Sequence, residues 1–80
     1  MPKWTVYMVK CRDGSLYTGM TNSIVDRLEK HNSGKGAKYT RSRLPVRLVW
    51  SKMVKTESAA RKLEAEIKKW TRLEKEALFA

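Results

Sequence analysis

The fold is decided by residues 4–20, which read WTVYMVKCRDGSLYTGM. β-Branched and aromatic residues dominate positions 4–11, as is typical of a β-strand. The Asp13-Gly14 pair that follows favours a tight hairpin turn. Residues 16–20 are then expected to form a second strand, antiparallel to the first. The stretch therefore predicts a β-hairpin at the start of the chain.

A helix is expected directly after the hairpin. Ser23 and Asp26 have the spacing of a capping box at its start. The residues expected on its core-facing side, at helical spacing, are Ile24, Leu28 and His31. Gly34 lies where a helix commonly ends. Residues 35–44 are basic, contain glycine and are predicted to form a loop.

The second half of the chain predicts one more strand and two more helices. The strand covers residues 46–54, and its alternating apolar side chains are Val46, Leu48 and Trp50. Thr56 is expected to cap the next helix, whose apolar positions are Ala59, Leu63, Ile67 and Trp70. Thr71 and Glu74 form a capping box that starts the last helix. The order ββαβαα predicts one α+β domain over residues 1–80, with a three-stranded antiparallel sheet flanked by helices.

Length and composition limit the possible functions. A chain of 80 residues, 41% of them hydrophobic, has room for one small core and the composition of a folded protein. The single cysteine, Cys11, and the single histidine, His31, exclude a disulfide framework and a Cys/His zinc site within one chain. No apolar run approaches the roughly 20 residues that span a bilayer, and the N-terminus has no signal-peptide pattern. We therefore expect a cytoplasmic protein with no membrane partner.

Positive charge is concentrated in the middle of a chain whose formal net charge is +10. No acidic residue lies between Glu29 and Glu57, and the basic residues there are Lys30, Lys35, Lys38, Arg41, Arg43, Arg47, Lys52 and Lys55. Such a segment is expected of a protein that binds a phosphate backbone. The predicted nucleic-acid contacts are Lys35, Lys38, Tyr39, Arg41 and Arg43, with DNA favoured over RNA. The alternatives are a charged surface without a specific ligand, an anionic membrane surface, or an acidic protein partner.

Four side chains in the first half of the chain have catalytic potential. Tyr7 and Tyr17 lie on the same face of the sheet only if the hairpin register allows it; otherwise they are ordinary strand aromatics. Because residues four apart share a helix face, Arg27 and His31 are expected side by side. An arginine can hold a phosphate with two hydrogen bonds, and a histidine can accept or relay a proton. Taken alone, Arg27 could equally be a solvated surface charge.

Glu64 is expected at the margin of the apolar face of the longer helix, whereas its neighbour Glu66 is expected to point to solvent. A carboxylate there is either an ion-pair partner or a metal ligand. One carboxylate, with waters and a substrate phosphate, is enough to hold Mg²⁺. Gly34-Lys35-Gly36 is not a P-loop, because it lacks the Gly-Lys-Ser/Thr ending and does not open a helix.

The order of these residues resembles the GIY-YIG nuclease domain. The two tripeptides that give the family its name stand here as Thr5-Val6-Tyr7 and Tyr17-Thr18-Gly19. They are followed by Arg27, His31 and Glu64. The likeness covers nearly the whole chain, and residues 13–40 are especially similar to small stand-alone GIY-YIG proteins of bacteria. The resemblance implies a GIY-YIG-like fold with a single-metal phosphodiesterase site.

The resemblance also implies a role for each residue. Glu64 would hold one Mg²⁺ or Mn²⁺ ion, and Arg27 would stabilise the charge on the phosphate in the transition state. Tyr17 is the preferred base for activating water, with Tyr7 and His31 orienting it. The implied function is a metal-dependent endonuclease or phosphodiesterase that acts on DNA or RNA.

The alternative function is a non-catalytic nucleic-acid-binding module that has kept the fold. Larger relatives often carry an asparagine after the metal-ligand helix, but no asparagine follows Asn32 in this chain. Some relatives have a lysine where this chain has Met20. Removal of Glu64 distinguishes the two functions: it should abolish cutting by an enzyme, but leave the affinity of a binding module unchanged or higher.

Overall fold

The central element is a three-stranded antiparallel sheet with the strand order β2-β1-β3. In the computed structural model, which describes residues 4–79, the strands are β1 (Trp4–Lys10), β2 (Leu16–Thr21) and β3 (Arg47–Val54). The helices are α1 (Ile24–Asn32), α2 (Lys38–Arg41), α3 (Glu57–Lys68) and α4 (Arg72–Glu76). The predicted α+β class and antiparallel sheet are confirmed.

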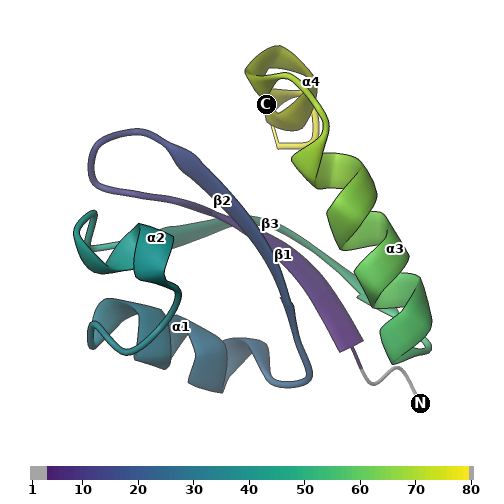
Figure 1. Cartoon of the computed structure of the whole chain (residues 1–80), viewed down its shortest axis with the longest axis horizontal. Helices are drawn as coiled ribbons and strands as arrows, with labels where there is room; N and C mark the ends of the chain where they lie inside the picture. Colours follow the sequence, from purple (N-terminus) through teal and green to yellow (C-terminus); the bar gives the residue numbers. More distant parts are fainter. Residues whose placement is uncertain (1–3, 80) are drawn as a thin grey trace.

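The sheet separates two layers of helices, with α1 and α2 on one side and α3 and α4 on the other (Figure 1). This arrangement follows from the alternation of side chains along β1, whose residues Val6–Val9 are all essentially buried. Val6 and Met8 pack with Ala60 and Ile67 of α3. The intervening residues, Tyr7 and Val9, lie in a second cluster with Ile24 and Leu28 of α1. The central strand therefore carries two small cores, one on each face.

The β1–β2 hairpin forms as predicted. Its register pairs Tyr7 with Gly19 and Val9 with Tyr17. In the turn, the Cys11 amide donates to the Ser15 carbonyl at 2.8 Å. Gly14 lies in this turn with φ +88°, a conformation that residues with a Cβ rarely adopt.

The predicted loop over residues 35–44 is wrong in one respect, because it contains the short helix α2. The amides of Thr40 and Arg41 both donate to the Ala37 carbonyl, at 3.1 and 3.2 Å. The Thr40 hydroxyl donates to the same carbonyl at 3.0 Å. A helix of four residues is too short to show a hydrophobic period, so tertiary contacts and not periodicity define it.

Two of the three predicted helix N-caps are confirmed, and one is wrong. The Thr56 hydroxyl accepts a hydrogen bond from the Ala59 amide at 3.0 Å, and the Thr71–Glu74 capping box is complete. The Ser23–Asp26 box is absent, because the Ser23 side chain makes no capping hydrogen bond. Instead the Thr21 hydroxyl accepts from the Ser23 amide at 3.1 Å.

Two predicted apolar faces are each wrong at one position, although the predicted Leu63, Ile67 and Trp70 do pack in the core. In α3, Ala59 is exposed and Ala60 is buried. In β3, the alternation breaks because Met8 pairs with Trp50 whereas Val9 pairs with Leu48, which leaves Val49 as the extra residue of a bulge. Leu48 is consequently 40% exposed.

No helix within residues 4–79 combines the length and the apolar character needed to cross a membrane.

Candidate active site

The hairpin register brings the two predicted tyrosines to one face of the sheet. Directly paired residues share a face, so Tyr7, Gly19, Val9 and Tyr17 all lie on the side covered by α1. The Tyr7 ring lies across Gly19, where an added Cβ would come within 2.5 Å of Tyr7 Oη. The absence of a side chain at position 19 therefore makes room for the Tyr7 phenol.

Helix α1 adds the two remaining residues predicted for this cluster. His31 is fully buried, and its Nε2 lies 2.8 Å from Tyr7 Oη. Arg27, one turn earlier, donates from Nε to the same oxygen over a longer distance of 3.4 Å. The structure thus brings Tyr7, Arg27 and His31 into one hydrogen-bonded cluster.

Tyr17 belongs to a stack of rings beside this cluster. Its ring meets the His31 ring edge to face at 5.6 Å and stacks on Tyr39 at 5.9 Å, with 22° between the two phenol planes. The Arg43 guanidinium covers the Tyr39 ring at 4.0 Å. Arg43 is held there by Asp13 of the hairpin turn, 3.1 Å from its Nε. Tyr39 therefore contacts both the Tyr17 ring and the Arg43 guanidinium.

Burial keeps both hydrogen-bonded groups neutral near pH 7. It lowers the pKa of His31, and the positive charge of Arg27 lowers this pKa further. Burial also raises the pKa of Tyr7, an effect opposed by the hydrogen bond and charge of Arg27. A neutral imidazole with one free nitrogen lone pair beside a phenol is an arrangement suited to proton transfer.

Glu64 approaches the tyrosines from the other helical layer. It pairs with Lys68 at 3.2 Å, and its side chain is 19% exposed. Lys68 Nζ lies 5.7 Å from the centroid of the Tyr17 ring, so Lys68 links the carboxylate to the tyrosine face. The negative charge of Glu64 also contributes to the raised pKa of Tyr7. Glu64 is therefore near enough to Tyr7 to influence its pKa, and Lys68 links it to the Tyr17 ring.

The donor set near the tyrosines fits a weakly chelated hard cation. Within residues 4–79 no three His, Cys, Asp or Glu side chains are grouped as a metal site. Glu64 is a partly accessible oxygen donor whose ion-pair partner, Lys68, is itself half-exposed and displaceable. This donor set suits Mg²⁺ or Mn²⁺ bound through one carboxylate, waters and a substrate phosphate. It does not suit an all-protein zinc site.

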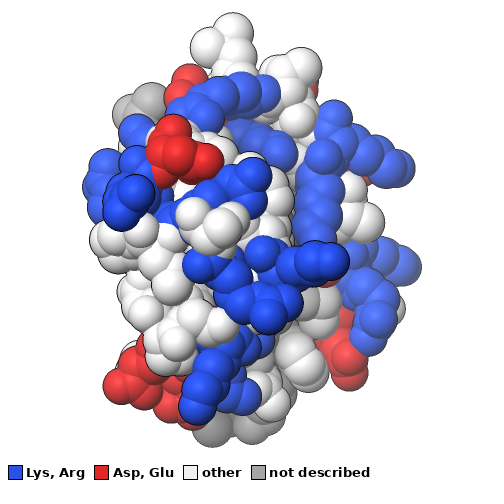
Figure 2. Space-filling model, turned by 60° about the vertical axis from the view of Figure 1, so that its left-hand side comes forward, with Lys and Arg blue, Asp and Glu red and all other residues white. Residues whose placement is uncertain are grey.

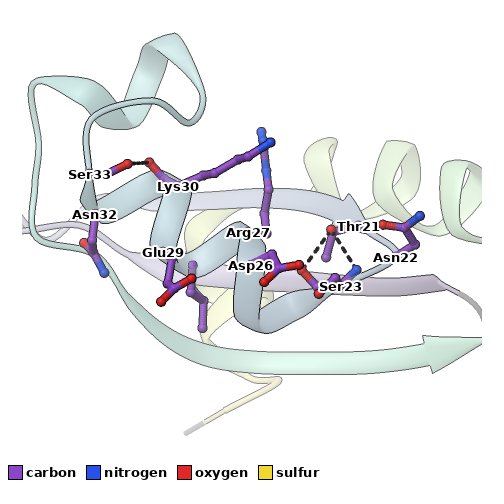
Figure 3. Close-up of a pocket in the computed structure, with 10 residues that line it drawn as sticks. Thr21, Asn22, Ser23, Asp26, Arg27, Glu29, Lys30, Asn32 and Ser33 are labelled. Carbon is purple, nitrogen blue, oxygen red and sulfur yellow. Dashed lines mark hydrogen bonds between the residues drawn. The ribbon is translucent and has the colours of Figure 1, made fainter.

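Arg27 also faces an open hollow along α1 (Figure 3). In this view the side chains of Arg27 and Lys30 extend to the same side of the helix, whereas Glu29 points away. Neither cation forms an ion pair within the described part of the chain. With Nε committed to Tyr7, the terminal nitrogens of Arg27 are available to an anion that enters this hollow.

The predicted nucleic-acid contacts lie on the side of the molecule that carries α1 and α2. Lys and Arg side chains form a broad band across this face, interrupted by few acidic groups (Figure 2). Lys35, Lys38 and Arg41 are exposed and form no ion pair within residues 4–79. Arg43 is engaged with Asp13 and Tyr39, so these two predicted nucleic-acid contacts also contact each other.

Sequence reasoning missed two residues that contact His31. The Thr40 hydroxyl lies 2.8 Å from His31 Nδ1, and a Cβ at Gly36 would come within 2.5 Å of the same nitrogen. Neither residue has a recognisable spacing relative to His31. The only available signal was a short run of glycine and threonine in a segment predicted to be a loop.

Known proteins similar to this chain share its small size. The UPF0213 protein of Staphylococcus aureus strain Mu3 is 57% identical over 70 residues, which cover 88% of this chain and 85% of the relative. The UPF0213 protein SSP2268 of Staphylococcus saprophyticus is 51% identical over 80 residues, covering 100% of this chain and 98% of the relative.

Two solution NMR structures have a similar fold. The UPF0213 protein BH0048 from Bacillus halodurans is 47% identical with a TM-score of 0.61, over 94% of this chain and 80% of the other. The protein EF2693 from E. faecalis is 43% identical with a TM-score of 0.64, over 96% and 85%. A family model described as the GIY-YIG catalytic domain matches residues 3–77, as the resemblance of the two tripeptides predicts. The chain therefore belongs to the GIY-YIG catalytic domain family.

Proposed function

We propose that this protein is a metal-dependent endonuclease that hydrolyses phosphodiester bonds in nucleic acid, with DNA favoured over RNA. The observation that carries this proposal is the buried Tyr7–His31 hydrogen bond with Arg27 on the same phenol oxygen. A phenol, an imidazole and a guanidinium joined in this way provide a proton acceptor and a phosphate-binding cation side by side. Membership of the GIY-YIG family and the basic face support the same function.

We assign the proton-transfer role to Tyr7 rather than to Tyr17, because Tyr7 is the tyrosine that contacts His31 Nε2 by a hydrogen bond. The attacking water would give its proton to Tyr7 Oη while the phenol proton moves to His31 Nε2. The resulting hydroxide attacks phosphorus, and the bond to the 3′ oxygen breaks. Tyr17, packed between the His31 edge and Tyr39, would fix the shape of the site.

Arg27 and Glu64 would act on the phosphate. The terminal nitrogens of Arg27 would bind the non-bridging oxygens and stabilise their negative charge in the transition state. Glu64 would hold the divalent ion, which when bound supplies Lewis-acid activation of the phosphate and stabilises the leaving oxygen. Lys68 would then exchange its ion pair with Glu64 for a contact with the substrate.

A cleavage assay with matched carboxylate variants tests the function. Labelled duplex, flap, nicked and branched DNA and structured RNA are incubated with Mg²⁺ or Mn²⁺ and the wild type, Glu64→Gln or Glu66→Gln. Glu66 lies two residues away on the exposed side of α3, so its variant controls for charge. We expect Glu64→Gln to reduce the cleavage rate by on the order of 10³-fold or more, because the ion loses its protein ligand, whereas Glu66→Gln cuts normally.

Two results would contradict the proposal. Cutting that survives Glu64→Gln would mean that Glu64 is not the ligand or that a contaminant cuts. Binding without cutting on every substrate would favour the non-catalytic binding module, for which the basic face alone is sufficient.

A further inference from the structure

The segment between α1 and β3 carries basic residues, and it also contacts the buried side of the His31 ring. Thr40 of α2 is fully buried, and its Oγ1 lies 2.8 Å from His31 Nδ1. Gly36 packs against the same ring: an added Cβ would lie 2.5 Å from Nδ1 and 2.8 Å from the His31 Cα. Position 36 therefore has no room for a side chain while His31 remains in place.

The direction of each hydrogen bond in this network follows from counting protons. Each hydroxyl has a single proton, and the Thr40 hydroxyl has the Ala37 carbonyl as an acceptor at 3.0 Å. If Thr40 donates there, its oxygen accepts from His31 Nδ1–H, and His31 Nε2 is left as a lone pair. Tyr7 O–H then donates to Nε2, and Arg27 Nε–H donates to the Tyr7 oxygen. Every donor in the chain of contacts has an acceptor.

The opposite tautomer leaves one donor without an acceptor. With the proton on Nε2, both His31 and Arg27 would donate to the Tyr7 oxygen. Before the attacking water and substrate enter the site, the Tyr7 O–H would then have no acceptor among residues 4–79, and Tyr7 is only 1% exposed. A buried donor without a partner is disfavoured. The Nδ1–H tautomer is therefore selected by the whole network.

We infer that Gly36 and Thr40 are positioning residues that hold His31 as its Nδ1–H tautomer, so that Nε2 is free to accept the Tyr7 proton. The inference about the tautomer stands on the geometry alone, and its consequence for catalysis rests on the proposed function. When water gives its proton to Tyr7 and Tyr7 gives its own to His31, the imidazolium retains two acceptors, the Tyr7 oxygen and Thr40 Oγ1. The proton leaves later to solvent, as the 3′ oxygen takes up a proton.

The first experiment observes the tautomer directly and needs no substrate. His31 is the only histidine in the chain, so a long-range ¹H–¹⁵N correlation spectrum of its ring is unambiguous. Near neutral pH we expect a protonated Nδ1 and a bare Nε2 in the wild type and in Thr40→Ser, which keeps the hydroxyl. Thr40→Val removes the acceptor, and the Nε2–H form should become populated. Thr18→Val is the matched control, because Thr18 is buried and its hydroxyl has no partner within the described residues.

The second experiment measures cleavage by the same proteins. Thr40→Val should lower kcat on the order of 10²-fold with little change in KM, because proton transfer and not substrate binding is impaired. Thr40→Ser should restore most of the rate. Rescue by Thr40→Ser, read together with the tautomer spectrum, separates this effect from a loss of folded protein, which would also lower the apparent kcat.

Each outcome bears on one proposal or the other. A wild-type ring protonated on Nε2, or an unchanged tautomer in Thr40→Val, overturns the inference even if the protein cuts. If Thr40→Val does not fold, Thr40→Ala and the wild-type spectrum decide the question in the same way. If the tautomer follows the prediction but no nucleic acid is cut, the positioning role stands and the endonuclease proposal fails.

Discussion

His31 is completely buried, and this burial disfavours its charged form. The titratable side chains around its ring are Tyr7, Tyr17 and Arg27, and none is a carboxylate. Burial and the Arg27 charge hold its pKa below the ordinary value of about 6.5 that applies to an unfolded chain. Below about pH 6.5 the unfolded chain thus binds more protons than the folded one, so the free energy of unfolding should fall as the pH is lowered toward the folded-state pKa.

Urea denaturation between about pH 7.5 and pH 5.5, above the range in which ordinary carboxylates titrate, measures this dependence. His31→Gln is the control, and its stability should vary less over the same interval. Equal pH dependence in the two proteins would mean that His31 is not the group responsible.

Gly19 is a second position at which a single residue determines the site. A Cβ there would lie 2.5 Å from Tyr7 Oη and 2.7 Å from its Cζ, and Tyr7 cannot move into solvent because it is buried. We expect Gly19→Ala to lower the free energy of unfolding by about 1–3 kcal/mol through overpacking and to weaken the Tyr7–His31 contact. Chemical denaturation tests this, with Ser51→Ala on the other side of Tyr7 as a control expected to stay within about 0.5 kcal/mol. A stable Gly19→Ala protein would show that the ring can be displaced.

Among the secondary-structure elements, those with a strong local sequence pattern could be predicted from the sequence. Irregularities that arise from tertiary contacts could not. The hairpin was predicted from its β-branched and aromatic residues and an Asp-Gly turn, β3 from apolar alternation and α3 from helical spacing, and all three elements form. The bulge at Val49 and the four-residue helix α2 have no local signature, because pairing with β1 and packing against His31 produce them. For the same reason Tyr7, Arg27 and His31 could be predicted as neighbours, whereas Thr40 could not.

Two helix caps that look alike in sequence should differ in their energetic contribution. The Thr56 hydroxyl accepts from the Ala59 amide, whereas Ser23 makes no side-chain capping bond. We therefore expect Thr56→Ala to lower the free energy of unfolding by about 1 kcal/mol and Ser23→Ala to change it by only a few tenths. Denaturation midpoints of the two variants measured together decide this, and equal losses would contradict the assigned difference.

At the scale of the whole molecule, the charge distribution predicts where nucleic acid binds. The net charge of +10 attracts any polyanion, so affinity alone does not identify a surface. A local contact has a different signature: each phosphate neutralised on duplex DNA contributes about 0.9 to the slope of log affinity against log salt. Lys38 and Arg41 belong to α2, the helix that also carries Thr40, and both are exposed and without ion pairs within residues 4–79.

The double variant Lys38→Gln/Arg41→Gln should therefore reduce the salt slope by about 1.8 and weaken binding most at low salt. Lys62→Gln/Lys69→Gln is the matched control, because it removes the same charge from the exposed side of α3 and its C-terminus. Binding is measured by fluorescence anisotropy on duplex DNA with EDTA present, so that cutting does not interfere. A smaller slope only in the first pair would assign the contact to α2, which carries Thr40 as well. Equal changes in both pairs would mean that the protein attracts DNA by net charge, with no preferred face.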